Sequence, residues 1–268
     1  MPAPDVDVDE LLALARSVTE AAGALLLDGA HRRRTEVGTK TSPTDMVTEM
    51  DRASEALVVE GLLRARPDDG VLGEEGSARP GTSGVRWVVD PLDGTTNYLY
   101  GFPAWAVSVA AESDGEVVAA VVADPSHGEV FTATRGGGAS CNGRPVVIEA
   151  GPALATALVG TGFSYESGRR ARQAAVLAEV LPRVRDVRRA GAAALDLCWV
   201  AAGRLDAFYE RGLQPWDLAA GALVATEAGA RAGDLAGGPP STAFALAAAP
   251  ALFEPLCTLL RDAGAADA

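Results

Sequence analysis

A strand that ends in acids and turns directly into a helix is the feature that most constrains this chain. It occupies residues 87–103, WVVDPLDGTTNYLYGFP. The apolar, β-branched start predicts a buried strand, and Asp90 and Asp93 follow at its carboxyl end. Gly94 allows a tight turn, and the two threonines after it are favoured N-cap residues, so we expect a helix to begin there. Carboxylates attract a hard cation and a helix N-terminus attracts anions. The stretch therefore predicts a divalent metal that holds a phosphate, the alternative being a turn with two solvated acids.

Composition limits the classes of function. The chain has 268 residues, 48% of them apolar, which is enough for one large core or two close subdomains. Its net charge of −13 and the lack of a basic run beyond residues 32–34 argue against a nucleic-acid surface. The acidic N-terminus lacks a leader pattern, and no apolar stretch approaches membrane-spanning length. Three widely spaced cysteines fit a reducing compartment. We expect a cytoplasmic protein that binds neither nucleic acid nor membrane.

The two histidines exclude further reaction classes. His31 lies beside arginines and His127 in a predicted turn, so each is expected to be a solvated surface residue. Neither setting suggests a Ser-His-Asp triad or a histidine-rich zinc site. Carboxylates, hydroxyls and metal-bound water remain for hydrolytic chemistry.

Two candidate segments precede the central stretch. Helical spacing predicts a first helix over residues 7–28, and a second helix begins within DMVTEMD and ends near Pro67. Thr48 and Asp51 have the spacing of a capping box, whereas Asp45 has no evident structural role and is otherwise a turn residue. The short strand VLGEEG ends in paired acids, which point to opposite sides of an extended backbone. We expect Glu74 to face the same site as the central acids, the alternative being a solvated strand end.

The rest of the chain divides into two textures. Alternating apolar runs predict an antiparallel meander over residues 105–134, and RGGG is expected to form a hairpin rather than a phosphate loop, because no Lys-Ser/Thr follows it. After about residue 150, strands alternate with helices. The strand LDAFYE presents Glu210, and Asp217 opens the next helix, where it is a candidate either for a cap or for a cleft. The last six residues are expected to fray.

Four motifs in order resemble one known family. They are the pattern KxxxxDxVTxxD in residues 40–51, GEEG, DPLDGTTNYLY and WDLAAGALVATEAGA. Together, from about Lys40 to Ala230, they resemble the inositol monophosphatase family of magnesium-dependent, lithium-sensitive phosphatases. The resemblance implies an α+β fold, a layered α-β-α-β-α sandwich, and usually a homodimer. It implies a single domain over residues 1–268, with a metal and phosphate half of about 1–150 and a substrate half of 151–268.

The resemblance also implies a metal site with two to three Mg²⁺ ions, inhibited by Li⁺. Glu74, Asp90 and the carbonyl of Leu92 would hold the first ion. The second would be held by Asp90, Asp93 and Asp217, with Glu74 near a third, weaker ion.

The same resemblance implies catalytic and substrate contacts. Thr95, with Glu74, would position the attacking water, and Asp45 would support Thr95. The N–H groups of Gly94, Thr95 and Thr96 would hold the phosphate. Asp217 would face the substrate as well as the metal.

Charge then dictates the mechanism. A phosphate monoester dianion repels hydroxide, so its oxygens must be neutralised, a water activated and the leaving alkoxide stabilised, which two or three magnesium ions can do. The rival haloacid dehalogenase class uses DxDGT with the first aspartate as nucleophile. Here Pro91 occupies that position, so we expect direct attack by a metal-activated water and no aspartyl phosphate.

Substrate choice is less constrained. Members of the family act on inositol phosphates, histidinol phosphate, fructose bisphosphate or 3′-phosphoadenosine nucleotides. Glu210 falls where the inositol enzymes place a glutamate towards ring hydroxyls, which favours a phosphorylated polyol and inositol 1-phosphate. Histidinol phosphate is the alternative, because an acidic wall could also receive the amine of an amino alcohol, and fructose 1,6-bisphosphate comes next.

GEEG in place of the commoner GEES, and YLYGFP after the central motif, depart from the family pattern at the pocket edge. From other classes, a regulatory binding protein with a phosphatase-like fold or a metal-binding structural module stays open.

Overall fold

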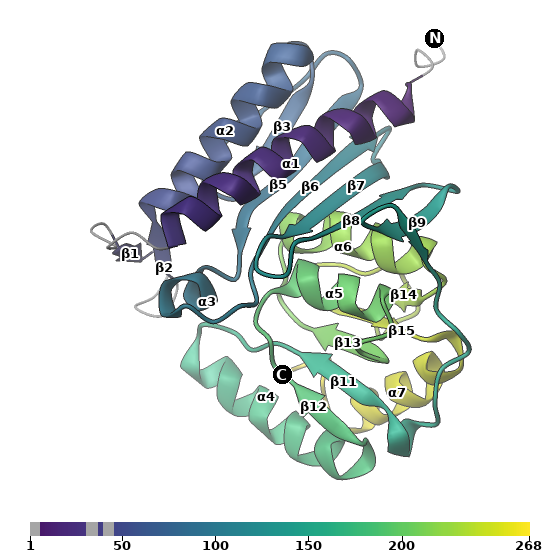
Figure 1. The fold of residues 1–268 in the computed structure, drawn as a ribbon. Helices are drawn as coiled ribbons and strands as arrows, with labels where there is room; N and C mark the ends of the chain where they lie inside the picture. The colour runs from purple at the N-terminus through teal and green to yellow at the C-terminus, as the bar shows by residue number, and fades with distance from the viewer. Residues whose placement is uncertain (1–5, 31–36, 40–45) are drawn as a thin grey trace.

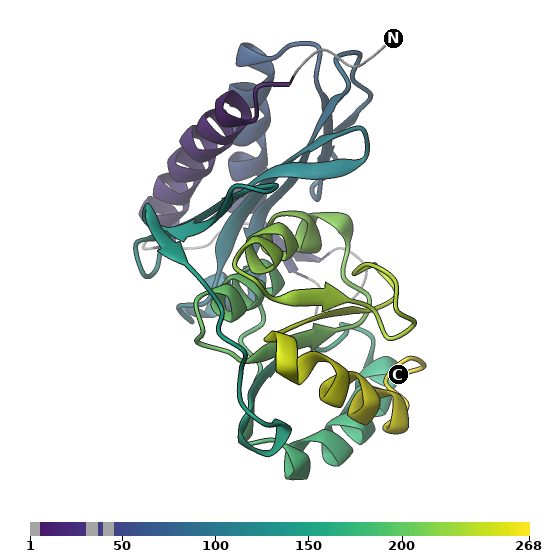
Figure 2. The same ribbon diagram turned by 90° about the vertical axis from the view of Figure 1, so that its right-hand side faces the viewer.

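The protein forms five stacked layers in the order α-β-α-β-α, as Figures 1 and 2 show from two sides. The computed structural model describes residues 6–30, 37–39 and 46–268. Two sheets form the β layers, and helices lie outside and between them. The predicted α+β sandwich is therefore confirmed. None of the helices in the described part of the chain is long and apolar enough to cross a membrane.

The first sheet has eight strands. They are β3 (Gly70–Gly73), β4 (Ala78–Arg79), β5 (Val85–Asp93), β6 (Ala106–Ser113), β7 (Glu116–Asp124), β8 (Glu129–Thr134), β9 (Gly138–Cys141) and β10 (Arg144–Val146). Their order is β10-β9-β8-β7-β6-β5-β3-β4. The pairs β6–β7 and β7–β8 are antiparallel, which confirms the meander, and β8 pairs antiparallel with β9 around the RGGG turn, which confirms the hairpin.

Two helices cover the outer face of this sheet. They are α1 (Val8–Ala30) and α2 (Glu49–Ala65), and the small strands β1 (Val37–Thr39) and β2 (Met46–Thr48) lie between them in the chain. The buried residues of α1 belong to one apolar cluster with Trp87 and Val89 of β5. Val88 belongs to another cluster, on the opposite face of the sheet. This alternation buries β5 on both faces, as its apolar sequence predicts.

The second sheet and its helices form the other half. The sheet has the order β12-β11-β13-β15-β14, and β11 is parallel to both of its neighbours. Its strands are β11 (Leu158–Thr161), β12 (Asp186–Arg188), β13 (Ala207–Glu210), β14 (Arg231–Gly233) and β15 (Ala245–Ala248). Helices α5 (Ala193–Ala201) and α6 (Pro215–Glu227) fill the layer between the sheets, and α4 (Ser167–Val180) and α7 (Pro250–Asp262) cover the outer face.

Helices α5 and α6 pack closely against each other over a glycine. A Cβ on Gly221 of α6 would lie 2.9 Å from the carbonyl oxygen of Ala194 in α5. Because real Cβ atoms essentially never approach that closely, the two helices can cross at this distance only over a glycine.

The prediction that the last six residues fray was wrong. Ala265 and Ala268 are 3% and 5% exposed, in the same apolar cluster as Phe244 and Leu260. Alanine loses almost no side-chain entropy on burial, so the apolar gain has only the backbone entropy to offset at these residues.

Candidate active site

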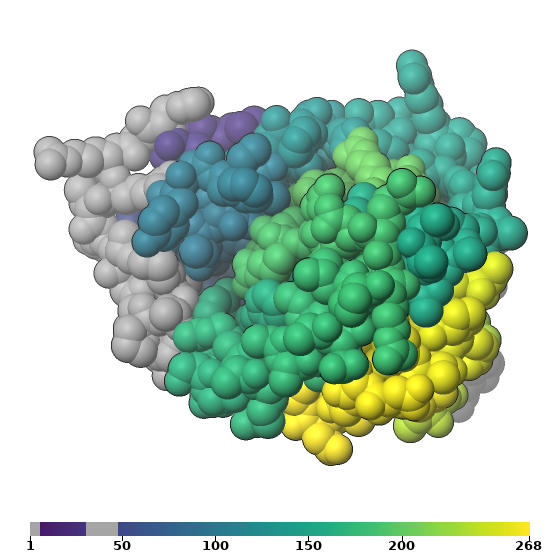
Figure 3. Space-filling view, turned by 90° about the horizontal axis from the view of Figure 1, so that it is seen from below, coloured from purple at the N-terminus to yellow at the C-terminus, as the bar shows by residue number. Residues whose placement is uncertain are grey.

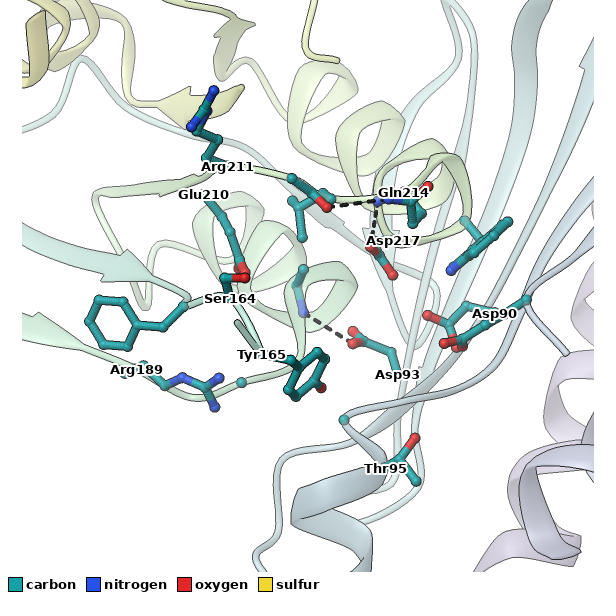
Figure 4. A pocket seen from close by; sticks show the side chains of 18 of the residues that line it. Asp90, Asp93, Thr95, Ser164, Tyr165, Arg189, Glu210, Arg211, Gln214 and Asp217 are labelled. Carbon is teal, nitrogen blue, oxygen red and sulfur yellow. Dashed lines mark hydrogen bonds between the residues drawn. The ribbon is translucent and has the colours of Figure 1, made fainter. Parts of the chain in front are cut away.

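One large cavity lies where the two halves of the molecule meet, at the carboxyl ends of β3, β5 and β13. Its volume is about 690 Å³. It is lined by most of the predicted site residues, namely Glu74, Asp90, Leu92, Asp93, Gly94, Thr95, Glu210 and Asp217. In Figure 4 the carboxylates of Asp90, Asp93 and Asp217 turn towards a shared space, and Glu210 lies on its far side.

The first two acids are brought together by strand register. Strands β3 and β5 are parallel, and Gly73 lies opposite Val89. The residues that follow, Glu74 and Asp90, therefore leave the same edge of the sheet at the same level, and the N–H of Glu74 donates to the carbonyl of Val89 at 3.2 Å. Glu74 lines the cavity, and its charge acts on Asp90.

A bulge separates Asp90 from Asp93. Asp90 lies opposite Ser108 and Asp93 opposite Ala106, so two residues of β5 face a single residue of β6. Pro91 has no N–H to donate to the sheet, which explains why the ladder is interrupted there. Ser54 of α2 donates to the carbonyl of Pro91 at 2.7 Å and fixes the bulge.

The turn into α3 (Thr95–Tyr100) differs from the predicted N-cap. Gly94 is the N-cap, with φ +85°, and no side-chain cap hydrogen bond is made. A Cβ on Gly94 would lie 2.8 Å from the carbonyl oxygen of Ala104, so both conformation and space require glycine. The Thr95 hydroxyl is therefore not used as a cap, and Thr96 does not line the cavity.

Asp51 holds the Thr95 hydroxyl. Thr95 Oγ1 lies 2.8 Å from Oδ1 of Asp51 and 3.1 Å from the carbonyl oxygen of Leu92. The predicted capping box is present, because Oδ2 of Asp51 accepts from the N–H of Thr48, but Asp51 also serves the site. Sequence reasoning missed that second role because the cap accounted for the residue. Asp45 lies outside the described residues.

Helix N-termini hold the other two acids. The N–H groups of Ala193 and Ala194 at the start of α5 donate to the Asp93 carboxylate at 3.2 and 2.8 Å. Oδ2 of Asp217 accepts from the N–H of Gln214 at 2.6 Å, in a capping box at the start of α6. The starts of α3 and α4 also line the cavity. Four helix dipoles therefore direct partial positive charge into an acidic site, which favours an anion beside the carboxylates.

Burial makes the charged forms of these acids unfavourable. Burial, followed by the charge of Glu74, raises the pKa of Asp90 well above its ordinary range. The pKa of Asp217 is raised well above its ordinary range by burial and by the charge of Asp93. Burial also raises the pKa of Asp93 to about 7, although the N–H of Ala194 lowers it. Like charges gathered away from water favour a bound cation.

The arrangement fits a magnesium site that is open rather than closed. In the part of the chain that the structure describes, no group of three or more Asp, Glu, His or Cys side chains is arranged to hold a metal ion by itself. Magnesium retains several waters and is bound through one or two carboxylates together with substrate phosphates. The separate buried carboxylates, facing a cavity large enough for a substrate, match that preference.

Glu210 forms the opposite wall with two arginines that sequence reasoning missed. Arg169 and Arg189 line the cavity, and the charge of Arg189 lowers the pKa of Glu210. Burial outweighs this effect and raises that pKa to about 7. A Cβ on Gly162 would lie 1.8 Å from Oε2 of Glu210, so glycine at 162 leaves room for the carboxylate. No motif surrounds Arg169 or Arg189 in the sequence that would have singled them out.

This raised pKa gives a pH dependence of stability. Between its ordinary pKa of 4.5 and about 7, the native Glu210 holds a proton that the unfolded chain has lost, so stability falls as pH rises through this window. We expect the metal-free wild type to lose more unfolding free energy from pH 5 to pH 8 than Glu210→Gln does, by up to about 3 kcal/mol. Urea unfolding at both pH values measures this, and equal losses in the two proteins would contradict it.

Asn97 fastens the turn that follows Gly94 to the second half of the molecule. Its Nδ2 donates to the carbonyl oxygens of Ala104 and Ala190 at 2.6 and 2.8 Å. The blue segment containing α3 accordingly lies against green residues of the second half in Figure 3. The predicted surface residue His127 lies outside the cavity, partly exposed and paired with Asp124 at 2.7 Å, and His31 lies outside the described residues.

Comparisons with known proteins agree with this geometry. The sequence pattern of the inositol monophosphatase family matches residues 7–265. This chain belongs to that family. It is 45% identical to an inositol-1-monophosphatase of Mycobacterium leprae over 97% of each chain. It is also 41% identical to the Nus factor SuhB of Pseudomonas aeruginosa over 85% of this chain and 86% of that one.

A solved structure shares the fold. The extragenic suppressor protein SuhB from Bartonella henselae superposes with a TM-score of 0.90 at 37% identity, covering 94% of this chain and 98% of that one. The protein is therefore a phosphatase of the inositol monophosphatase family, as the four motifs predict.

Proposed function

We propose that this phosphatase is a magnesium-dependent inositol-1-monophosphatase. The observation that carries the proposal is the gathering of Glu74, Asp90, Asp93 and Asp217 in one cavity, with Glu210 on the opposite wall. An acidic end suits metal ions and a phosphate, and the Glu210 carboxylate opposite suits hydroxyl donors of a polyol.

The proposed ligand sets follow the family pattern. Glu74, Asp90 and the carbonyl of Leu92 would hold one magnesium, and Asp90, Asp93 and Asp217 a second, with Glu74 near a third, weaker ion. Bound magnesium would neutralise phosphate oxygens and lower the pKa of a water. Lithium is the expected inhibitor.

The protein groups would orient the reactants. The first N–H groups of a helix have no partner within it, so those of Gly94 and Thr95, which line the cavity, can bind the phosphate, and that of Thr96 follows in the same turn. Thr95 has two acceptors within reach for its single hydroxyl proton, Asp51 and the Leu92 carbonyl. Its oxygen lone pairs therefore remain free to accept a hydrogen bond from the attacking water and to direct that water towards phosphorus. Glu74, at the same edge of the cavity, would share in activating the water, and Asp45 would be a further support for Thr95.

Glu210 gives the test of substrate class. We expect phosphate release with magnesium to be faster from inositol 1-phosphate than from histidinol phosphate. Loss of a hydrogen bond to a charged group costs about 1.5–3 kcal/mol, so Glu210→Gln should raise KM for inositol 1-phosphate roughly 10- to 100-fold. Turnover of 4-nitrophenyl phosphate, which has no hydroxyls for Glu210, is the matched control and should change little.

Two outcomes would redirect the proposal. Preference for histidinol phosphate, with the same loss in Glu210→Gln, would assign Glu210 to an amine and make the protein a histidinol-phosphatase. Preference for fructose 1,6-bisphosphate would instead assign substrate recognition to Arg169 and Arg189 on the same wall.

A second candidate is a regulatory binding role, which the name of the Pseudomonas aeruginosa relative, Nus factor SuhB, favours. Failure of the wild type to hydrolyse any of these phosphates with magnesium would support that role. We also propose a homodimer, which light scattering would show as twice the chain mass of 27.4 kDa.

A further inference from the structure

Helix α2 buries polar side chains where an apolar stripe would be expected. Asp51, Ser54 and Glu55 are 0%, 0% and 4% exposed, and Val58 and Leu62 continue the same buried face. Residues three and four apart share one face of a helix, so these three side chains point together towards the first sheet. Burying polar groups costs free energy unless each is hydrogen bonded, so their partners explain why they are there.

Each side chain holds a different segment of the candidate active site. Asp51 binds the Thr95 hydroxyl at 2.8 Å, and Ser54 binds the carbonyl of Pro91 at 2.7 Å. Glu55 accepts from the N–H groups of Glu75 and Ser77 at 2.7 and 3.0 Å. One helix face therefore contacts the water-positioning threonine, the bulge between the central acids, and the loop that carries Glu74.

Glu55 also fills the space beneath that loop. A Cβ on Gly73 would lie 2.5 Å from Oε2 of Glu55, so the carboxylate lies against the backbone of the residue before Glu74. On the opposite side the N–H of Glu74 donates to Val89. The backbone of Glu74 is thus fixed from both directions, by α2 and by β5.

We propose that Glu55 is a positioning residue that sets Glu74 against Asp90. It touches neither cavity nor substrate and acts through the backbone of residues 73–77. The inference rests on the proposed metal site, because it assigns Glu55 to the placement of a proposed magnesium ligand.

Glu55→Gln removes one of the two acceptor oxygens and keeps the size of the side chain. A glutamine offers one acceptor oxygen and an NH₂ group, which cannot accept from a backbone N–H, so either Glu75 or Ser77 loses its partner. The loop then relaxes, and Glu74 moves relative to Asp90. Outer groups that orient a metal ligand typically change metal affinity by about 10- to 100-fold when they are mutated.

The chain offers a matched control in Glu227. Its carboxylate also accepts two backbone N–H groups, from Gly136 and Gly138 at 2.8 and 2.9 Å, and so holds a hairpin that does not line the cavity. Glu227→Gln therefore loses the same kind of bond at another place. A general effect of loosening a loop would appear in both variants.

The test measures magnesium affinity by calorimetry and the magnesium dependence of phosphate release. We expect Glu55→Gln to weaken both about tenfold or more, and Glu227→Gln to leave both within about twofold, at similar losses of Tm. Equal magnesium affinities in the two variants would overturn the proposal.

A second variant covers the case in which Glu55→Gln fails to fold. Glu55→Asp keeps the charge and both oxygens but is one methylene shorter, so the same tenfold weakening is expected, and unchanged affinity would overturn the proposal. If the wild type binds magnesium but hydrolyses no phosphate, the proposed function fails, while calorimetry still decides the role of Glu55.

Discussion

Asp90→Asn is expected to lower kcat/KM by about 10³-fold or more while leaving the metal-free protein at least as stable as the wild type. Asp90 is 1% exposed and lies among the charges of Glu74, Asp93 and Asp217. Both proposed magnesium ions would be held by this one carboxylate, and a metal's stabilisation of a transition state is worth several kcal/mol, about tenfold in rate per 1.36 kcal/mol.

The metal-free variant is expected to be at least as stable as the wild type because Asp90 is buried among like charges. An amide removes a buried like charge, and its oxygen can still accept from the N–H of Leu92, which binds Oδ1 of Asp90 at 3.1 Å. Magnesium bound to the native wild type would stabilise it by mass action. The variant should lose that gain, which urea unfolding at pH 8 with chelator and with magnesium will measure.

Asp196→Asn is the matched control. Asp196 is another buried acid, 1% exposed, whose pKa is raised well above its ordinary range by burial, but it does not line the cavity. It should lose far less activity than Asp90→Asn. Retention of more than a tenth of the wild-type activity by Asp90→Asn would contradict the metal assignment.

Thr95→Val is expected to lower kcat by about 10²- to 10³-fold with little change in KM. The substitution removes the hydroxyl proposed to orient the attacking water, and a positioned group that handles a proton contributes about 10²- to 10⁴-fold. Oδ1 of Asp51 loses its Thr95 partner, at a cost of about 1–3 kcal/mol in unfolding free energy.

Thr95→Ser separates the hydroxyl from the methyl group. Serine keeps the donor to Asp51, so its kcat should stay within about tenfold of the wild type. Steady-state kinetics on inositol 1-phosphate give kcat and KM for both variants. Equal losses in valine and serine would mean that packing at position 95, rather than the hydroxyl, supports activity.

Local sequence signals predicted the elements of the site well. The strand, the acids at its end and the helix after Gly94 occur as expected, because an apolar run, a proline and a glycine each restrict the nearby backbone directly. The capping box of Thr48 and Asp51 and the meander are equally local. The N-cap at Thr95 or Thr96 was wrong because a left-handed glycine formed the turn and left the threonine hydroxyl to another partner.

The sequence by itself determined which chemical groups this protein brings to a site: three carboxylates at two strand ends, a glycine turn and a fourth acid at a helix start. These follow from patterns within a few residues. Only the tertiary structure decided what holds them. Asp51 forms a hydrogen bond with Thr95, 44 positions away in the sequence, and Glu55 with Glu75, 20 positions away. Arg189 and Glu210 line the same cavity. Such pairs depend on how layers stack and strands register, and a single sequence carries no short-range periodicity that encodes them.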